Sequence, residues 1–80
     1  GIIGLSRALM YAGAKNLIVS LWQVADASTA SLMIEFYKQH LYHSDNNLFA
    51  EDLRKAKLSL LNSENYQDPY YWAPFILVGL

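Results

Sequence analysis

Three segments of the chain carry apolar residues at the spacing of an α-helix. They run from about Ile2 to Ala12, from about Ala27 to Tyr42 and from about Leu48 to Asn62. Gly13 follows the first segment and suits the left-handed conformation that ends many helices. In the second helix we expect a buried stripe of Ala30, Met33, Ile34, Tyr37 and Leu41. In the third we expect Phe49, Leu53, Ala56 and Leu60 to be buried, with Glu51 pairing with Lys55 at i, i+4.

Two further segments read as strands, from about Asn16 to Trp22 and from about Trp72 to Val78. Both are nearly continuous in apolar character, which favours strands covered on both faces, as in a parallel or mixed α/β sheet. Pro74 lacks an amide hydrogen and should lie near the start of the last strand or on an unpaired edge. The predicted fold class is α/β, in the order helix, strand, helix, helix, strand.

Two strands alone make a marginal sheet, so the pattern describes the edge of a larger one. The chain also begins at Gly1 and stops at Leu80 within apolar patterns, as expected of a piece of a larger domain. An unpaired apolar strand recruits partners, and we therefore expect self-association through the exposed strand edge.

Composition removes several classes of function. The 80 residues include six basic and seven acidic side chains, so no basic surface for nucleic acid or for an anionic membrane is expected. No cysteine is present, which leaves the chain without a disulfide, a thiolate metal site or a thiol nucleophile. No cofactor is implied. No apolar run is long enough for a membrane span, and we expect no signal peptide, because no basic segment comes before an apolar one near Gly1. The compartment is left open, with a cytoplasmic location favoured.

Most of the residues that could carry chemistry have simpler explanations. Ser6 lies in a segment similar to a nucleophile elbow, but the strand which that motif requires does not precede it. His40 and His43 are three residues apart, without a third metal ligand nearby, at a helix end that favours histidine. The aromatic residues from Tyr66 to Phe75 lack the basic groove of a base-stacking platform, so core packing is favoured. We predict no catalytic residue and no metal site from these patterns.

Asp26 has two explanations that the residues alone leave open. It stands just ahead of the second predicted helix, where aspartate is among the best N-cap residues. It also lies just past the carboxyl end of a strand, where ligands bind in open α/β sheets. With Trp22 as an aromatic wall, an acid at this position suits a cationic side chain.

The chain as a whole resembles the C-terminal part of CHAT domains, which are caspase- and separase-like domains often found with tetratricopeptide repeats. The resemblance covers essentially all 80 residues and rests on an ordered set of short matches. These are Gly4-Leu5-Ser6-Arg7-Ala8, Ala12-Gly13-Ala14, Ser20-Leu21-Trp22 with Val24 and Asp26, Leu32-Met33, Phe36-Tyr37, Ala50, Leu53-Arg54, Ala56, Asp68-Pro69, Tyr71-Trp72-Ala73, Phe75 and Val78-Gly79.

The resemblance implies that residues 1–80 are the C-terminal fragment of a single domain with a caspase-like sheet, comparable to a caspase small subunit. Active members are cysteine endopeptidases, whose histidine and cysteine precede the segment matched here. The resemblance thus implies the part of the domain that carries the substrate pocket and no nucleophile. Separases have a similar Trp-x-Val-x-Asp pattern, which implies that Trp22, Val24 and Asp26 read a basic residue before the cut.

The implied partners are the remainder of the domain and either tetratricopeptide repeats or a protein substrate. Many CHAT domains have no known substrate. A domain that has lost catalysis and serves as an interaction or scaffold module is therefore the alternative.

Overall fold

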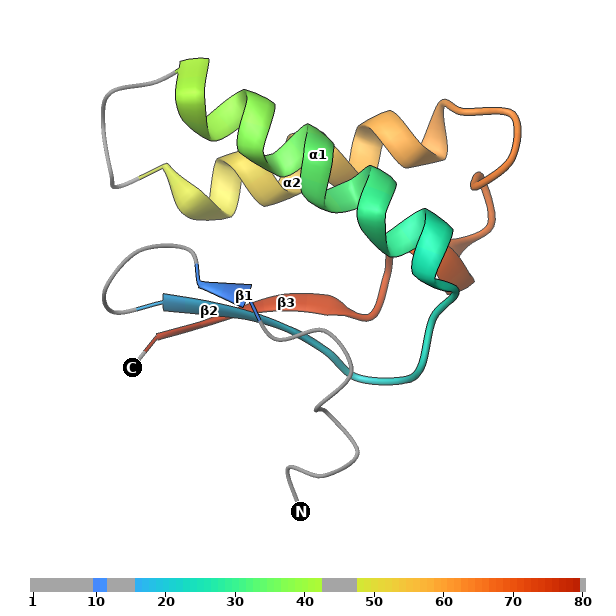
Figure 1. The fold of residues 1–80 in the computed structure, drawn as a ribbon, viewed down its shortest axis with the longest axis horizontal. Coiled ribbons are helices and arrows are strands. Elements are labelled where there is room, and N and C mark those ends of the chain that lie inside the picture. Colours follow the sequence, from blue (N-terminus) through green and yellow to red (C-terminus); the bar gives the residue numbers. More distant parts are fainter. Residues whose placement is uncertain (1–9, 12–15, 43–47, 80) are drawn as a thin grey trace.

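The computed structural model describes residues 10–11, 16–42 and 48–79. A three-stranded sheet, in the order β1 (Met10–Tyr11), β2 (Asn16–Ser20) and β3 (Phe75–Gly79), is antiparallel throughout. Two helices, α1 (Asp26–Tyr42) and α2 (Phe49–Leu61), lie side by side on one face of it (Figure 1). The chain belongs to the α/β class, and from β2 to β3 the order is strand, helix, helix, strand, as predicted.

The N-terminal helix prediction is wrong at its end, because Met10 and Tyr11 form β1 and pair with Ile18 and Leu17. The rest of that prediction, apart from these two residues, lies outside the described residues. A backbone hydrogen-bond ladder with β2 has replaced the local helical preference at this point. Helical spacing in a short apolar stretch does not exclude a strand.

The described strands contain no parallel pair, although the continuous apolar run in β2 suggested a parallel or mixed sheet. The pairing of β2 with β3 explains why the sequence of β2 is continuously apolar. Ile18 lies opposite Leu77 and faces the helices, whereas Val19, opposite Ile76, points to the other face. Both faces of these two strands are therefore apolar, and Ile76 is 37% exposed. Pro74 directly precedes β3, as its missing amide hydrogen required.

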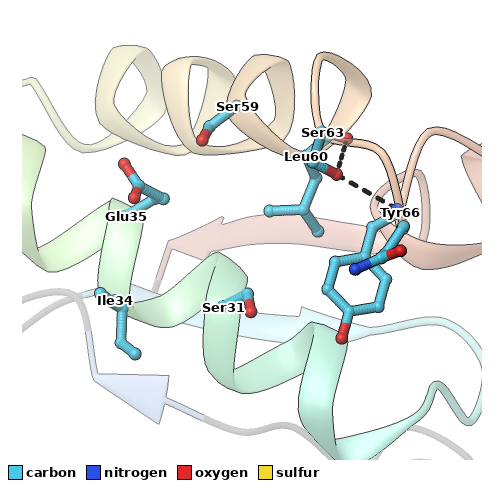
Figure 2. Close-up of a pocket in the computed structure, with 8 residues that line it drawn as sticks. Ser31, Ile34, Glu35, Ser59, Leu60, Ser63 and Tyr66 are labelled. Atoms are coloured by element: carbon cyan, nitrogen blue, oxygen red, sulfur yellow. Dashed lines mark hydrogen bonds between the residues drawn. The ribbon is translucent and has the colours of Figure 1, made fainter.

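Helix α2 has the buried face that its sequence predicts: Phe49, Leu53, Ala56 and Leu60 are all buried, together with Asp52. On its outer side Glu51 pairs with Arg54 at i, i+3, where the sequence had suggested Lys55. After the helix, Ser63 Oγ donates to the carbonyl of Leu60 at 2.7 Å and accepts from the amide of Tyr66 at 3.1 Å (Figure 2). This serine thereby provides hydrogen bonds to backbone groups at the C-terminal end of the helix, where carbonyl groups lack partners within the helix.

The buried stripe predicted for α1 is wrong except at Met33. The side chains that face α2 and the sheet are Ser28, Leu32, Met33 and Phe36. Ile34 is 55% exposed and Leu41 is 82% exposed. Because α1 is apolar on two sides, periodicity alone does not identify the side that packs. Ser28 is tolerated in the core since its hydroxyl donates to the carbonyl of Ala25 at 2.9 Å.

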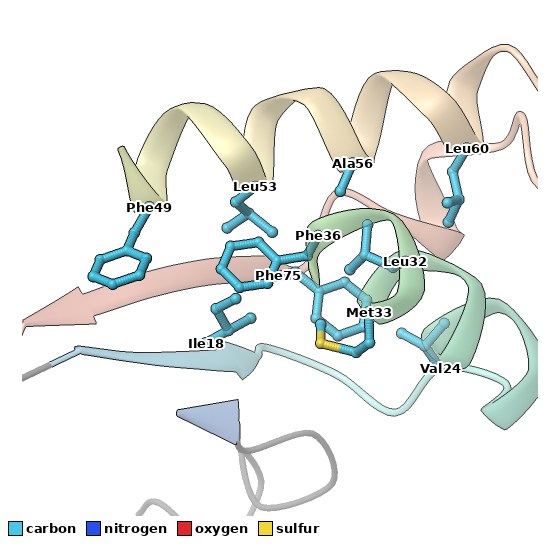
Figure 3. Close-up of a cluster of buried hydrophobic side chains, with 10 residues drawn as sticks. All are labelled: Ile18, Val24, Leu32, Met33, Phe36, Phe49, Leu53, Ala56, Leu60 and Phe75. Atoms are coloured by element: carbon cyan, nitrogen blue, oxygen red, sulfur yellow. The ribbon is translucent and has the colours of Figure 1, made fainter. Parts of the chain in front are cut away.

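The core forms between the helices and the sheet and draws on β2, β3, both helices and the loop before α1 (Figure 3). Its members are Ile18, Val24, Leu32, Met33, Phe36, Phe49, Leu53, Ala56, Leu60 and Phe75. Tyr66, Tyr71 and Trp72 pack against it, so these members of the aromatic cluster do serve packing.

A polar pair joins α1 to α2 beside this core. Asp52 is fully buried, and its Oδ2 lies 3.4 Å from Nδ1 of His40. The imidazole of His40 also stacks on Phe36 and Phe49, with ring centroids 6.1 and 4.8 Å away. The predicted histidine at the helix end is confirmed, because His40 lies in the last turn of α1. His43 and Ser6 lie outside the described residues.

Candidate functional site

The candidate site is built on the loop from Leu21 to Ala25, which leads from the carboxyl end of β2 to the start of α1. The amide of Leu21 still bonds to the carbonyl of Pro74 at 3.0 Å, after which the chain leaves the sheet. Ser20 is buried and its hydroxyl donates to the carbonyl of Trp22. Val24 is buried in the core and anchors the loop (Figure 3). The loop is therefore held at both ends and in its middle.

A second segment, the 3₁₀ helix η2 (Pro69–Tyr71), packs on this loop through two aromatic residues. Trp22 Nε1 donates to the carbonyl of Tyr70 at 3.2 Å, and the two rings stack with centroids 6.4 Å apart. In return the Tyr70 hydroxyl donates to the carbonyl of Gln23 at 2.8 Å. Asp68 fixes Tyr70 from the other side, since its Oδ1 accepts from the Tyr70 amide at 2.9 Å.

An open depression of about 510 Å³ lies where the two segments meet, lined by Gln23, Val24, Ala25, Asp26 and Tyr70. Two of the three predicted site residues, Val24 and Asp26, thus line the depression. The third, Trp22, does not line it but stacks on Tyr70, which does. Trp22 and Tyr70 keep 40% and 48% of their surface exposed. Sequence reasoning missed Tyr70 as a site residue because it was grouped with the core aromatics.

Asp26 is the first residue of α1 and not its N-cap, which corrects the capping prediction by one position. The amide of Thr29 bonds to the carbonyl of Ala25 at 3.1 Å, so Ala25 occupies the capping position. Asp26 is exposed in the first helical turn, where the helix dipole favours a negative charge. Its carboxylate therefore borders the depression and complements the helix at the same time.

The charge of the site is negative. The two segments that meet at the depression, residues 20–26 and 67–74, contain Asp26 and Asp68 and have neither lysine nor arginine. Exposed aromatic faces next to carboxylates attract cations such as the side chains of arginine and lysine. The arrangement is suited to hold a cationic side chain and supplies no nucleophile of its own.

A second cavity, of about 220 Å³, lies between α1 and the end of α2 (Figure 2). Two of its polar residues have partners within the fold: Ser63 caps α2, and Glu35 pairs with Lys38 at 3.5 Å. Residues 10–11, 16–42 and 48–79 include no group of three potential metal ligands. No helix within the described part of the chain is long and apolar enough to cross a membrane.

The aromatic contact between the two segments should be measurable. We expect Tyr70→Ala to lower the free energy of unfolding by about 0.5–1.5 kcal/mol, the usual worth of an aromatic pair beyond its burial. In a Trp72→Phe background, the emission of Trp22 should shift to longer wavelength, because its ring loses the cover of Tyr70. Tyr66→Ala in the same background is the control, since Tyr66 makes an edge-to-face contact with Tyr71 and not with Trp22. An unchanged Trp22 spectrum in Tyr70→Ala would contradict the contact.

Comparison of the sequence with known proteins identifies the family of the chain. The family model for the CHAT domain matches residues 1–80. Tetratricopeptide repeat protein 28 of Homo sapiens is 36% identical over 80 residues, and its Mus musculus counterpart is 34% identical. Each match covers 99% of this chain and 3% of the relative, so the chain spans a small part of either protein. No solved structure gave a significant match. The chain belongs to the CHAT domain family.

Proposed function

We propose that this chain is the part of a CHAT-type cysteine endopeptidase domain that carries the substrate pocket and no nucleophile. The pocket is the depression beside Trp22, Val24 and Asp26, and it reads a basic residue before the scissile bond. The observation that supports this most directly is the position of Asp26. Its carboxylate borders an open depression at the carboxyl end of β2, beside the exposed Trp22–Tyr70 pair.

The chemistry of recognition follows from these groups. An arginine or lysine side chain in the depression would bring its charge to the Asp26 carboxylate and its stem to the face of Tyr70. A charge-assisted hydrogen bond to a carboxylate is about twice as strong as a neutral one, which favours a cation over a neutral amide of similar size. The sequence contains no cysteine, so the thiolate that attacks the peptide bond belongs to another segment.

The experiment is a cleavage assay with the full-length protein and fluorogenic peptides that differ only in the residue before the cut. We expect peptides with arginine or lysine there to be cleaved, and peptides with glutamine to be cleaved far more slowly. Replacement of the nucleophilic cysteine, identified in the full-length sequence after the strand preceding this segment, should abolish all cleavage. Equal rates for arginine and glutamine would refute the basic specificity.

A catalytically inactive scaffold is the second candidate, and the surface of α1 favours it. Ile34, Tyr37 and Leu41 are exposed on that helix, as expected of a module whose role is contact with other protein segments. The two candidate functions predict different residues in the part of the full-length protein that precedes Gly1. A His-Gly after one strand and a cysteine after the next would support the peptidase, whereas substitution of either would support the scaffold.

Under either candidate, residues 1–80 form the C-terminal part of one domain. The remainder of that domain and tetratricopeptide repeats are then its partners, with a protein substrate added for the peptidase. Ile76, which is 37% exposed on the face of the sheet away from the helices, supports further packing against protein.

A further inference from the structure

The outer side of β3 presents backbone groups that the described strands do not pair. In the order β1-β2-β3, the strand β3 pairs only with β2 among the described strands. The bond from the Leu21 amide to the Pro74 carbonyl fixes the alternation of hydrogen-bonded positions. Ile76 and Val78 therefore direct their backbone groups to β2. Phe75, Leu77 and Gly79 direct theirs to the outer side.

A groove of about 290 Å³ follows this side of β3, between the strand and α2. Its apolar lining includes Leu53 of α2 with Phe75 and Leu77 of β3. Leu53 and Phe75 are buried and belong to the core (Figure 3). Arg54 and Lys57 of α2 also line the groove. The groove thus combines an apolar wall, a cationic rim and a row of backbone donors and acceptors.

The two cations differ in what they bind. The guanidinium of Arg54 is held by Glu51, with Nε donating to Oε2 at 3.0 Å. Burial lowers the pKa of Lys57, and no carboxylate among the described residues lies within ion-pair distance of its ammonium. A partly desolvated ammonium beside an apolar groove gains most from an anion brought by a ligand.

We propose that the outer edge of β3 accepts an extended acidic peptide segment as an added strand. An aliphatic side chain of the segment occupies the groove beside Leu53, and a carboxylate of the segment pairs with Lys57. Strand addition supplies affinity through the backbone, and the side chains on one face supply specificity. This surface is distinct from the depression at Asp26 and does not depend on the proposed peptidase function.

The charge of the rim argues against a second copy of this chain as the occupant. Two-fold pairing of β3 with its equivalent would bring no carboxylate to Lys57, because Phe75–Gly79 contains no acid, and Arg54 is already paired with Glu51. An acidic segment, in contrast, neutralises the rim.

The probe is a fluorescein-labelled heptapeptide, Thr-Glu-Thr-Val-Thr-Glu-Thr, which presents glutamate, valine and glutamate on one face when extended. We expect saturable binding to the full-length protein in fluorescence anisotropy. Lys57→Gln should weaken it about tenfold, in keeping with the strength of a charge-assisted hydrogen bond. Lys55→Gln, which removes the same charge from α2 outside the groove, should leave the affinity unchanged. A peptide with lysine in place of both glutamates should not bind.

N-methylated peptides test the backbone without altering the protein. One peptide carries N-methyl groups on the threonines at its third and fifth positions. A second carries them on the residues at its second, fourth and sixth positions, which are the two glutamates and the valine. Since an added strand directs only one set of amides at β3, one peptide should lose binding and the other keep it. Equal loss or equal retention would overturn strand addition, as would the absence of saturable binding. Dimers that grow stronger with Lys57→Gln in sedimentation would instead identify a second copy as the occupant and overturn the proposal.

Discussion

Asp26→Asn is expected to reduce cleavage after arginine or lysine by about 10- to 100-fold in the full-length protein, with cleavage after glutamine unchanged. The carboxylate supplies the negative charge at the depression, and a hydrogen bond to a charged group contributes about 1.5–3 kcal/mol. Each 1.36 kcal/mol changes a rate tenfold, so the loss of that bond gives this range. The measurement is kcat/KM for the two peptide series, compared between wild type and variant.

Two controls separate recognition from folding. Glu64→Gln removes an exposed acid that does not line the depression, and it should leave the arginine-to-glutamine ratio as in the wild type. The melting temperature of Asp26→Asn should fall only slightly, because an acid in the first helical turn contributes about 0.3–1 kcal/mol. A large loss of stability with an unchanged ratio would show that Asp26 serves only the helix.

Phe36→Ala is expected to cost about 3–5 kcal/mol of unfolding free energy, the usual cost of deleting a buried phenylalanine ring. Phe36 is 1% exposed and stacks on His40, so its removal leaves a cavity between α1, α2 and the sheet. Folded domains are stable by only about 5–15 kcal/mol in total, so the variant should unfold at distinctly lower urea concentrations than the wild type. Proteolysis of the full-length protein across a urea series measures the difference.

The matched control for Phe36 is Ile34→Ala on the same helix. Ile34 is 55% exposed, and surface substitutions usually change stability by about 0.5 kcal/mol or less. This comparison decides which side of α1 packs, because the periodicity of the sequence had assigned Ile34 to the core. Similar costs for the two variants would contradict the packing described here.

The two helices show why one buried face was predictable and the other was not. Charged side chains occupy the outer side of α2, at Glu51, Arg54 and Lys55, so only one stripe was apolar enough to pack. Around α1 the apolar residues occupy two sides. Contact with α2 and with Ile18 and Phe75 of the sheet selects the side with Leu32 and Phe36. That side is offset from the predicted stripe by one residue, which is about 100° around the helix axis.

The candidate site was likewise predictable from the sequence only in part. Three of its residues lie close together in the sequence, namely Trp22, Val24 and Asp26. A predicted strand end followed by a predicted helix start was sufficient to identify this stretch as a candidate site. Tyr70 is 48 residues from Trp22, and its stacking and hydrogen bonds depend on where η2 packs. No local pattern contains that information.

By itself, the sequence determined the α/β class, the order from β2 to β3, the buried face of α2 and the family. These depend on residues that are close together or on short matches in a set order, and local physics is sufficient for them. Only the tertiary structure decided the packed side of α1, the placement of Tyr70 at the depression and the groove beside β3. Each of these depends on contacts between distant segments, whose geometry is set by the fit of the whole core and not by the spacing of neighbouring residues.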